Sequence, residues 1–191
     1  QENFGAISGM KQLSEELGVQ VQFNPIITAK NNGDESTCSR RVHESKLAEF
    51  YADPEVSSSS TQPIYTREAT DAVPCEVVFN GGAVDTDGNV YVCNQLRMVL
   101  GNILDHSLGH IWRSSSVIKE LRAHTVKDLK TCRVCSLFEH CARCPGLAQL
   151  EDGDILGCSS IAKRVAIARK QSGVFPAQGH IFAVPTKKGG E

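Results

Sequence analysis

The segment "CRVCSLFEHCARCPG", residues 132–146, places four of the chain's eight cysteines within thirteen residues. Cys132 and Cys135 form one C-x2-C pair, and Cys141 and Cys144 form a second. Two thiolates at this spacing can converge on one metal centre, whereas a disulfide between them closes almost no loop and constrains the unfolded chain little. The segment therefore favours metal ligation over local disulfides.

The composition agrees with a metal-binding protein of the cell interior. The chain has 191 residues and a formal net charge of -2, which fits one or two globular domains and gives no general attraction to nucleic acid or to an anionic membrane. Its sequence shows no apolar run long enough to span a membrane and no secretory signal. We therefore expect a cytoplasmic protein, with a disulfide-bonded extracellular domain as the alternative.

Zinc is one candidate metal. Two C-x2-C pairs supply the four thiolates of a structural zinc site, but zinc modules typically separate the pairs by about 12 to 20 residues. Here only the five residues "SLFEH" lie between them. Zinc would also leave Cys75, Cys93 and Cys158 without a role. A zinc-stabilised, non-catalytic binding module nevertheless stays open as an alternative.

Iron-sulfur chemistry accounts for more of the cysteines. In two-cluster bacterial ferredoxins, the last cysteine of a compact run is followed by proline and binds the other cluster. Cys144 is likewise followed by Pro145. By analogy, seven cysteines divide into two ligand sets: Cys132, Cys135, Cys141 and Cys158 for one cluster, and Cys75, Cys93 and Cys144 for the other.

Basic residues also surround the cysteine run. A cluster held by four thiolates carries net negative charge and would be stabilised by nearby cations, but solvated surface charges give the same pattern. Both interpretations stay open for Lys127, Lys130, Arg133, Arg143, Lys163 and Arg164.

Hydrophobic periodicity predicts an α+β chain. Residues 8–17 have helical spacing, with Ser8 as the N-cap and Gly18 as the stop, and residues 19–27, "VQVQFNPII", alternate as a strand does. Further elements are predicted as follows: short helices at 43–52 and 108–124, strands around the Asp87-Gly88-Asn89 turn at 75–93, and a helix from Ser159 or Ser160 to Gly173.

A segment rich in serine and proline, Asp53–Pro63, is the best candidate for a linker, because these residues offer little to pack. We therefore predict four parts: residues 1–52, a linker at 53–71, a cysteine-rich domain at 72–173, and a frayed tail at 174–191.

The order of these landmarks resembles the SPASM domain, the C-terminal auxiliary-cluster domain of many radical S-adenosylmethionine enzymes. The cysteine spacing, Gly88 ahead of Cys93, and the segments "LGNILDHSLGHIW" and "CARCPGLAQLEDGD" occur in the family's order over about residues 72–170. The resemblance implies a small cysteine-rich α+β domain, with a β-hairpin and short helices, that binds two [4Fe-4S] clusters. Its implied ligands are the same two sets of cysteines.

The implied cluster of Cys75, Cys93 and Cys144, which we call the first cluster, has only three cysteine ligands. Some family members carry another cysteine a few residues after the first, but this chain has Asn80, Gly81 and Gly82 there. The fourth ligand of this cluster would be Cys38 or a water molecule, or its fourth iron would have no ligand from the protein or solvent.

The N-terminal part resembles the end of a larger domain. "ELGVQVQFNPIITAKNNGDEST" is similar to the last helix, strand and loop of the partial (β/α) barrel that precedes the SPASM domain. The C-x3-C-x2-C motif that binds the S-adenosylmethionine-cleaving cluster does not occur in these 191 residues. The resemblance thus implies the C-terminal part of a radical enzyme, with no catalytic residues of its own and with S-adenosylmethionine bound in the missing barrel.

The family's usual work is the maturation of peptides or cofactor precursors, as in pyrroloquinoline quinone or mycofactocin biosynthesis or sulfatase maturation. The resemblance therefore implies a domain for substrate positioning or electron transfer. The implied partners are a peptide or small-protein substrate, the missing radical domain, a peptide chaperone and an electron donor.

Overall fold

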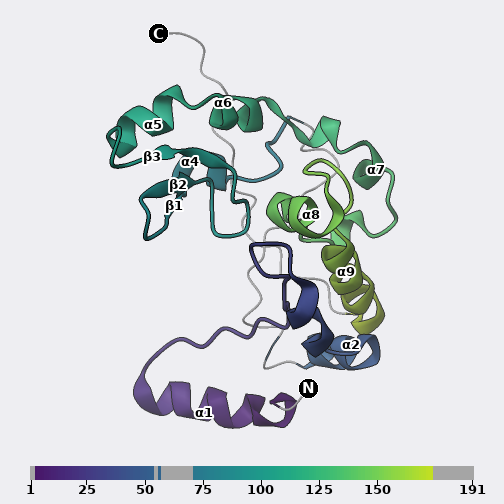
Figure 1. The fold of residues 1–191 in the computed structure, drawn as a ribbon. Coiled ribbons are helices and arrows are strands. Elements are labelled where there is room, and N and C mark those ends of the chain that lie inside the picture. The colour runs from purple at the N-terminus through teal and green to yellow at the C-terminus, as the bar shows by residue number, and fades with distance from the viewer. Residues whose placement is uncertain (1–2, 54–55, 57–70, 174–191) are drawn as a thin grey trace. The chain divides into compact units, whose positions relative to one another are not determined.

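The structure is a computed structural model, and it describes residues 3–53, 56 and 71–173 (Figure 1). The chain forms two compact units, each described here by itself. The first unit combines residues 1–66, 136–142 and 160–182, and the second combines residues 67–135, 143–159 and 183–191. Most of the predicted linker, residues 57–70, and the whole predicted tail lie outside the described residues.

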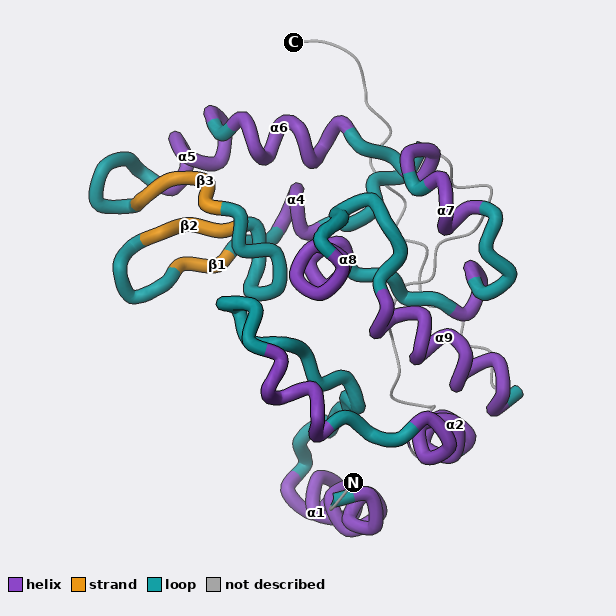
Figure 2. Tube along the Cα trace, turned by 45° about the vertical axis from the view of Figure 1, so that its right-hand side comes forward, coloured by secondary structure: helices purple, strands orange, loops and turns teal. Residues whose placement is uncertain are grey.

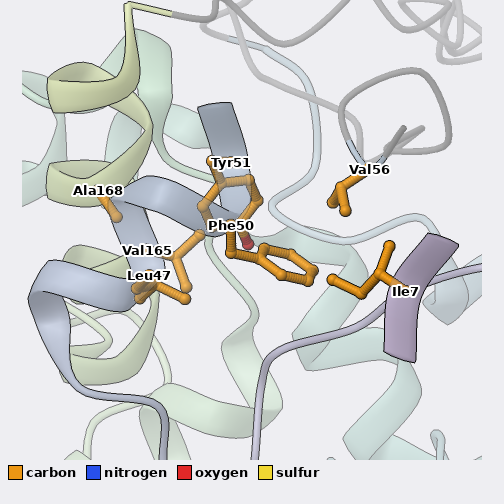
Figure 3. Close-up of a cluster of buried hydrophobic side chains, with 7 residues drawn as sticks. All are labelled: Ile7, Leu47, Phe50, Tyr51, Val56, Val165 and Ala168. Atoms are coloured by element: carbon orange, nitrogen blue, oxygen red, sulfur yellow. The ribbon is translucent and has the colours of Figure 1, made fainter. Parts of the chain in front are cut away.

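The first unit is helical. Its elements are η1 (Phe4–Ala6), α1 (Ile7–Leu17), η2 (Glu35–Arg40), α2 (Glu44–Ala52), η4 (Phe138–His140) and α9 (Ser160–Ser172). Helices α2 and α9 pack against each other (Figure 2). Their apolar faces build one core together with Ile7 of α1 and Val56 (Figure 3). Its residues are Ile7, Leu47, Phe50, Tyr51, Val56, Val165 and Ala168.

Polar contacts reinforce the packing of α9 in this unit. The Arg169 guanidinium lies over the Tyr51 ring, 4.9 Å from its centroid. Arg164 donates from Nη2 to the carbonyl oxygen of Val42 at 2.9 Å. Helix α9 was predicted correctly as a helix, and it shares its core with a helix that lies about a hundred residues earlier in the chain.

Helix α1 confirms the helix predicted over residues 8–17, except at its N-cap. Its N-cap is Ala6 rather than Ser8, and it ends as predicted at Gly18, which takes the left-handed conformation at φ 65°. The predicted apolar residues of this helix lie on its surface: Met10, Leu13 and Leu17 are 42%, 53% and 64% exposed.

The predicted strand at residues 19–27 is wrong. This segment forms no β-ladder, and side chains bind two of its backbone groups. Arg41 donates from Nε to the Ile27 carbonyl at 2.8 Å, and the Ile26 amide donates to the Asn24 side chain at 2.9 Å. A strand needs a partner strand for its backbone groups, and alternation of side chains alone does not supply one.

The second unit carries a small antiparallel sheet. Strands β1 (Ala83–Val84), β2 (Asn89–Tyr91) and β3 (Val99–Asn102) lie in the order β1-β2-β3 (Figure 2). The predicted hairpin turn is confirmed: Gly88 has φ 82° and donates its amide to the Asp85 carbonyl at 3.1 Å. Together with the helices, this sheet confirms the α+β class.

Helices cover the rest of the second unit. They are α4 (Val77–Asn80), α5 (Leu108–Ser114), α6 (Ser116–Ala123), η3 (Val126–Asp128), α7 (Lys130–Arg133) and α8 (Pro145–Asp152). Five buried residues form the core here: Val78, Val92, Leu96, Ile118 and Leu121.

Two predictions for this unit need correction. Residues 77–80 form one helical turn instead of a strand, because α4 packs on α6 and Arg122 donates from Nε to the Val78 carbonyl at 2.9 Å. The predicted helix at 108–124 is two helices that break at Ser115, where ψ is 124°. Serine side chains compete for backbone groups, and Ser114 does so by donating to the His110 carbonyl.

Candidate metal centre

Three of the predicted ligands, Cys75, Cys93 and Cys144, come together in the second unit. Burial, as the largest cause, and the charges of Cys144 and Cys93 together raise the pKa of the Cys75 thiol to about 11. Charges of neighbouring thiolates have this effect only at short range. We call these three residues the first thiol group.

Backbone amides face the sulfurs of this group. The Leu96 amide donates to Cys93 Sγ at 3.2 Å. The Val77 amide hydrogen-bonds to Cys75 and thereby counteracts part of the effect of burial on its pKa. Amide donors stabilise negative charge on sulfur, and such hydrogen bonds are part of the surroundings of iron-sulfur clusters.

Cys144, the third residue of the first thiol group, is the N-cap of α8. Pro145 fills the first helical position, where a missing amide hydrogen costs nothing. Burial raises the pKa of Cys144, whereas hydrogen bonds from the amides of Leu147 and Gly146 lower it. The start of α8 therefore directs two backbone donors at this sulfur.

Gly146 allows α8 to come this close to the loop that carries Cys93. A Cβ atom at position 146 would lie 2.8 Å from the carbonyl carbon of Gln95 and 2.9 Å from the amide nitrogen of Leu96. Both are closer than real Cβ contacts, so any side chain would push the two segments apart. The Cys-Pro-Gly sequence thus serves both the helix start and the gathering of the thiols.

A second thiol group consists of Cys132, Cys135 and Cys158, also in the second unit. Burial raises the pKa of Cys132, and the charges of Cys158 and Cys135 add to this increase. The Cys135 amide donates to the Cys132 carbonyl at 3.0 Å, which closes the turn between them. Cys132 Sγ lies 3.9 Å from the carbonyl oxygen of Gly157, the residue before Cys158.

Arg143 accompanies the second thiol group. Its side chain is buried, with 8% of its surface exposed. It donates from Nε to the Gly157 carbonyl at 2.7 Å and from Nη2 to the Ile155 carbonyl. The positive charge of Arg143 lowers the pKa of Cys132, against the larger effect of burial.

The remaining two cysteines lie in the first unit. Cys141 follows η4 and donates its amide to the Phe138 carbonyl at 3.2 Å, and Cys38 lies within η2. All eight cysteines are in described ranges, and all are thiols rather than disulfides. Electrostatic coupling thus links six of the predicted ligands as two sets of three. Their assignment as ligands, and that of Cys141 to the second set, stays a prediction.

Sequence reasoning missed two residues of this site. Arg143 was one of several basic residues near the cysteines, and its burial could not be recognised from the sequence. Gly146 stood in the opening segment without a role, although a proline and a glycine directly after a cysteine signal a helix start and a close backbone approach.

The donor types fit iron-sulfur clusters. Each group supplies three soft thiolates, and the first also supplies backbone amides at the sulfurs. In the described part of the chain, no group of three or more histidine, cysteine, aspartate or glutamate side chains is placed to hold a single metal ion. No helix within the described ranges is long and apolar enough to cross a membrane.

Comparison with known proteins assigns the segment that carries most of these cysteines. A family model described as SPASM, an iron-sulfur cluster-binding domain, matches residues 75–145. The searches of curated proteins and of solved structures found no match. The matched segment begins at Cys75, continues through Cys144 and ends before Cys158, and the match indicates iron-sulfur cluster binding by this part of the chain.

Proposed function

We propose that this chain is the auxiliary-cluster part of a radical S-adenosylmethionine oxidoreductase that matures a peptide or a cofactor precursor. The observation that carries the proposal is the SPASM match over residues 75–145, and the electrostatic coupling of six cysteines as two sets of three within one compact unit supports it. Each group would hold one [4Fe-4S] cluster, with Cys141 as the fourth ligand of the second.

Bound clusters would supply one-electron redox chemistry, or an open iron for substrate where only three thiolates bind. The chain's own residues prepare the surroundings. Burial makes the thiols poor anions in the absence of metal, as the raised pKa of Cys75 shows, and the amide donors offset this cost once negative sulfur is present. The domain would position the substrate or pass electrons during maturation.

Helix α1 supports a connection to a further domain. Its apolar residues Met10, Leu13 and Leu17 are on the surface, and burying them would be favourable at about 25 cal/mol per Å². We propose that the rest of a partial (β/α) barrel, with the S-adenosylmethionine site, packs on this face. A peptide or small-protein substrate, a peptide chaperone and an electron donor would complete the system.

Iron and acid-labile sulfide measured after anaerobic reconstitution test the cluster assignment. Two [4Fe-4S] clusters predict about eight iron atoms per chain, with visible charge-transfer absorption. Fewer than about four iron atoms per chain would contradict it. Stoichiometric zinc that reconstitution does not replace would indicate the binding module instead, and oxidised thiols without metal would indicate a disulfide-bonded domain.

Two matched substitutions test the division of the ligands. Cys158→Ala should remove only the electron paramagnetic resonance signal of the second cluster, and Cys144→Ala only that of the first. Each variant serves as the control for the other, because both remove one half-buried thiol from the same unit. Loss of the same signal in both variants would show that the division is wrong.

A further inference from the structure

Arg143 is a buried cation with donors to spare. A guanidinium offers five N-H donors. Two of its nitrogens, Nε and Nη2, bind the carbonyls of Gly157 and Ile155. The third, Nη1, is buried and has no hydrogen-bond partner among the described residues. Burying an unsatisfied donor is costly, so this nitrogen calls for an acceptor.

The sulfur of Cys132, in the second thiol group, is a candidate for that acceptor. Arg143 and Cys132 share the Gly157 carbonyl, at 2.7 Å from Nε and 3.9 Å from Sγ. Burial raises the pKa of Cys132, and the charge of Arg143 offsets part of this increase. The charge also acts on Cys144, the next residue in the chain and a member of the first thiol group.

The two carbonyl contacts also fix the loop that leads to Cys158. Ile155 and Gly157 both lie between the end of α8 and Cys158. Gly157 itself is confined, because a Cβ atom there would lie 2.7 Å from the Asp154 carboxylate. Arg143, which directly precedes Cys144 in the chain, thus holds this loop through two hydrogen bonds.

We propose that Arg143 is a positioning residue that holds the Cys158 loop beside Cys132 and donates from Nη1 to sulfur of the cluster bound there, which raises the reduction potential of that cluster. The proposal rests on the proposed function. A positive charge and a hydrogen bond to sulfur both stabilise the reduced cluster, which carries one more negative charge. Lysine would keep the charge but not the planar fork that reaches two carbonyls and a third acceptor.

Redox titration of the anaerobically reconstituted full chain, with dithionite as reductant and electron paramagnetic resonance as the readout, tests this inference. In Arg143→Met we expect a more negative midpoint potential for the second cluster. The expected change is about tenfold in the equilibrium constant for reduction, or about 59 mV for a one-electron couple. The matched control is Arg133→Met, an exposed arginine next to Cys132, which should leave the potential unchanged.

The outcomes separate this inference from the proposed function. If the wild-type chain assembles no cluster, the proposed function fails. If clusters assemble but Arg143→Met and Arg133→Met have the wild-type potential, the role of Arg143 is refuted while the function stands. If Arg143→Met does not retain the cluster, Arg143→Lys decides: a potential more negative than that of the wild type is expected, and one equal to the wild type contradicts the donation from Nη1.

Discussion

Because Gly146 has no side chain, α8 can lie close to the loop that carries Cys93 of the first thiol group. In Gly146→Ala, the new Cβ would meet backbone atoms of Gln95 and Leu96 at less than 3.0 Å. We expect a loss of about 1 to 3 kcal/mol in unfolding free energy, as for other overpacked sites. Selective loss of the first cluster signal should accompany it, because α8 carries Cys144. Denaturant unfolding and electron paramagnetic resonance measure the two effects.

Gly9→Ala is the matched control, since a Cβ there has nothing within 4 Å and the position lies inside helix α1. This change should leave the clusters intact and keep or slightly increase stability. Equal effects of the two substitutions would contradict the packing role of Gly146.

Asp85 gives the hairpin a dependence on pH. Its carboxylate accepts a hydrogen bond from the Tyr91 hydroxyl at 2.7 Å, with further bonds from Asn89 and the Asp87 amide. These bonds, the Tyr91 bond foremost, lower the pKa of Asp85 to about 2. A carboxyl with a lowered pKa stabilises the fold fully above its unfolded value of about 3.9, and this contribution disappears as the pH falls toward the folded value.

We therefore expect the melting temperature of the metal-free chain to fall between pH 5 and about pH 2, and to fall less steeply in Asp85→Asn. Thermal melts followed by circular dichroism across this range measure the slope. Asp105→Asn, at an exposed position, is the control and should retain the wild-type slope. Parallel curves for the wild type and Asp85→Asn would refute the role of Asp85.

At the residue level, the sequence indicated the candidate thiol ligands, but it did not indicate the residues that hold the segments around them. The C-x2-C spacing and Cys144-Pro145 indicated which thiols to expect in each group, because short spacings limit where side chains can point. The buried position of Arg143 and the close approach at Gly146 depend on segments that meet only in the folded chain. A local sequence pattern does not predict such contacts between distant segments.

Among the elements, helix α2 depends on a partner that lies far away in the sequence. Leu47 is 4% exposed and belongs to the core that α2 shares with α9. Leu47→Ala should cost about 2 to 5 kcal/mol, through lost burial and the cavity left behind. Urea unfolding followed by circular dichroism measures it.

Leu13→Ala removes the same atoms from α1, where Leu13 is 53% exposed. It should change the stability by only about 0.5 kcal/mol. A similar cost at both positions would mean that the shared core of α2 and α9 does not carry the stability of this unit.

Elements with their own stop signals were predicted well, and those fixed by distant contacts were not. Gly18 and Gly173 mark the ends of α1 and α9, Gly88 lies in the turn of the β-hairpin, and each has a positive φ. By contrast, residues 19–27 alternate like a strand, yet their backbone groups bind side chains and loops. Residues 77–80 are rich in β-formers, yet α6 holds them as a helical turn.

For the whole molecule, the two units do not follow the predicted domain limits of 72–173, which stay a prediction. Helix α9 lies inside those limits but packs with α2, which lies outside them. A fragment of residues 72–173 would expose Val165 and Ala168, which are buried in the full chain. We expect this fragment to aggregate, or to show a mobile α9, in size-exclusion chromatography and hydrogen exchange.

Co-expression with residues 1–56 should restore a soluble complex, because it returns Leu47, Phe50 and Tyr51 to α9. A fragment that is monomeric and equally protected in α9 without this partner would contradict the shared core. The full chain, measured in parallel, provides the reference for both experiments.

The pairing of α2 with α9 also sets an order of events during synthesis. A ribosome adds about 5 to 20 residues per second, so α2 leaves it several seconds before α9. The core that contains Leu47 and Val165 cannot close until Ser172 has emerged. This shared core is thus completed only after Cys158, the last cysteine of the sequence, has been made.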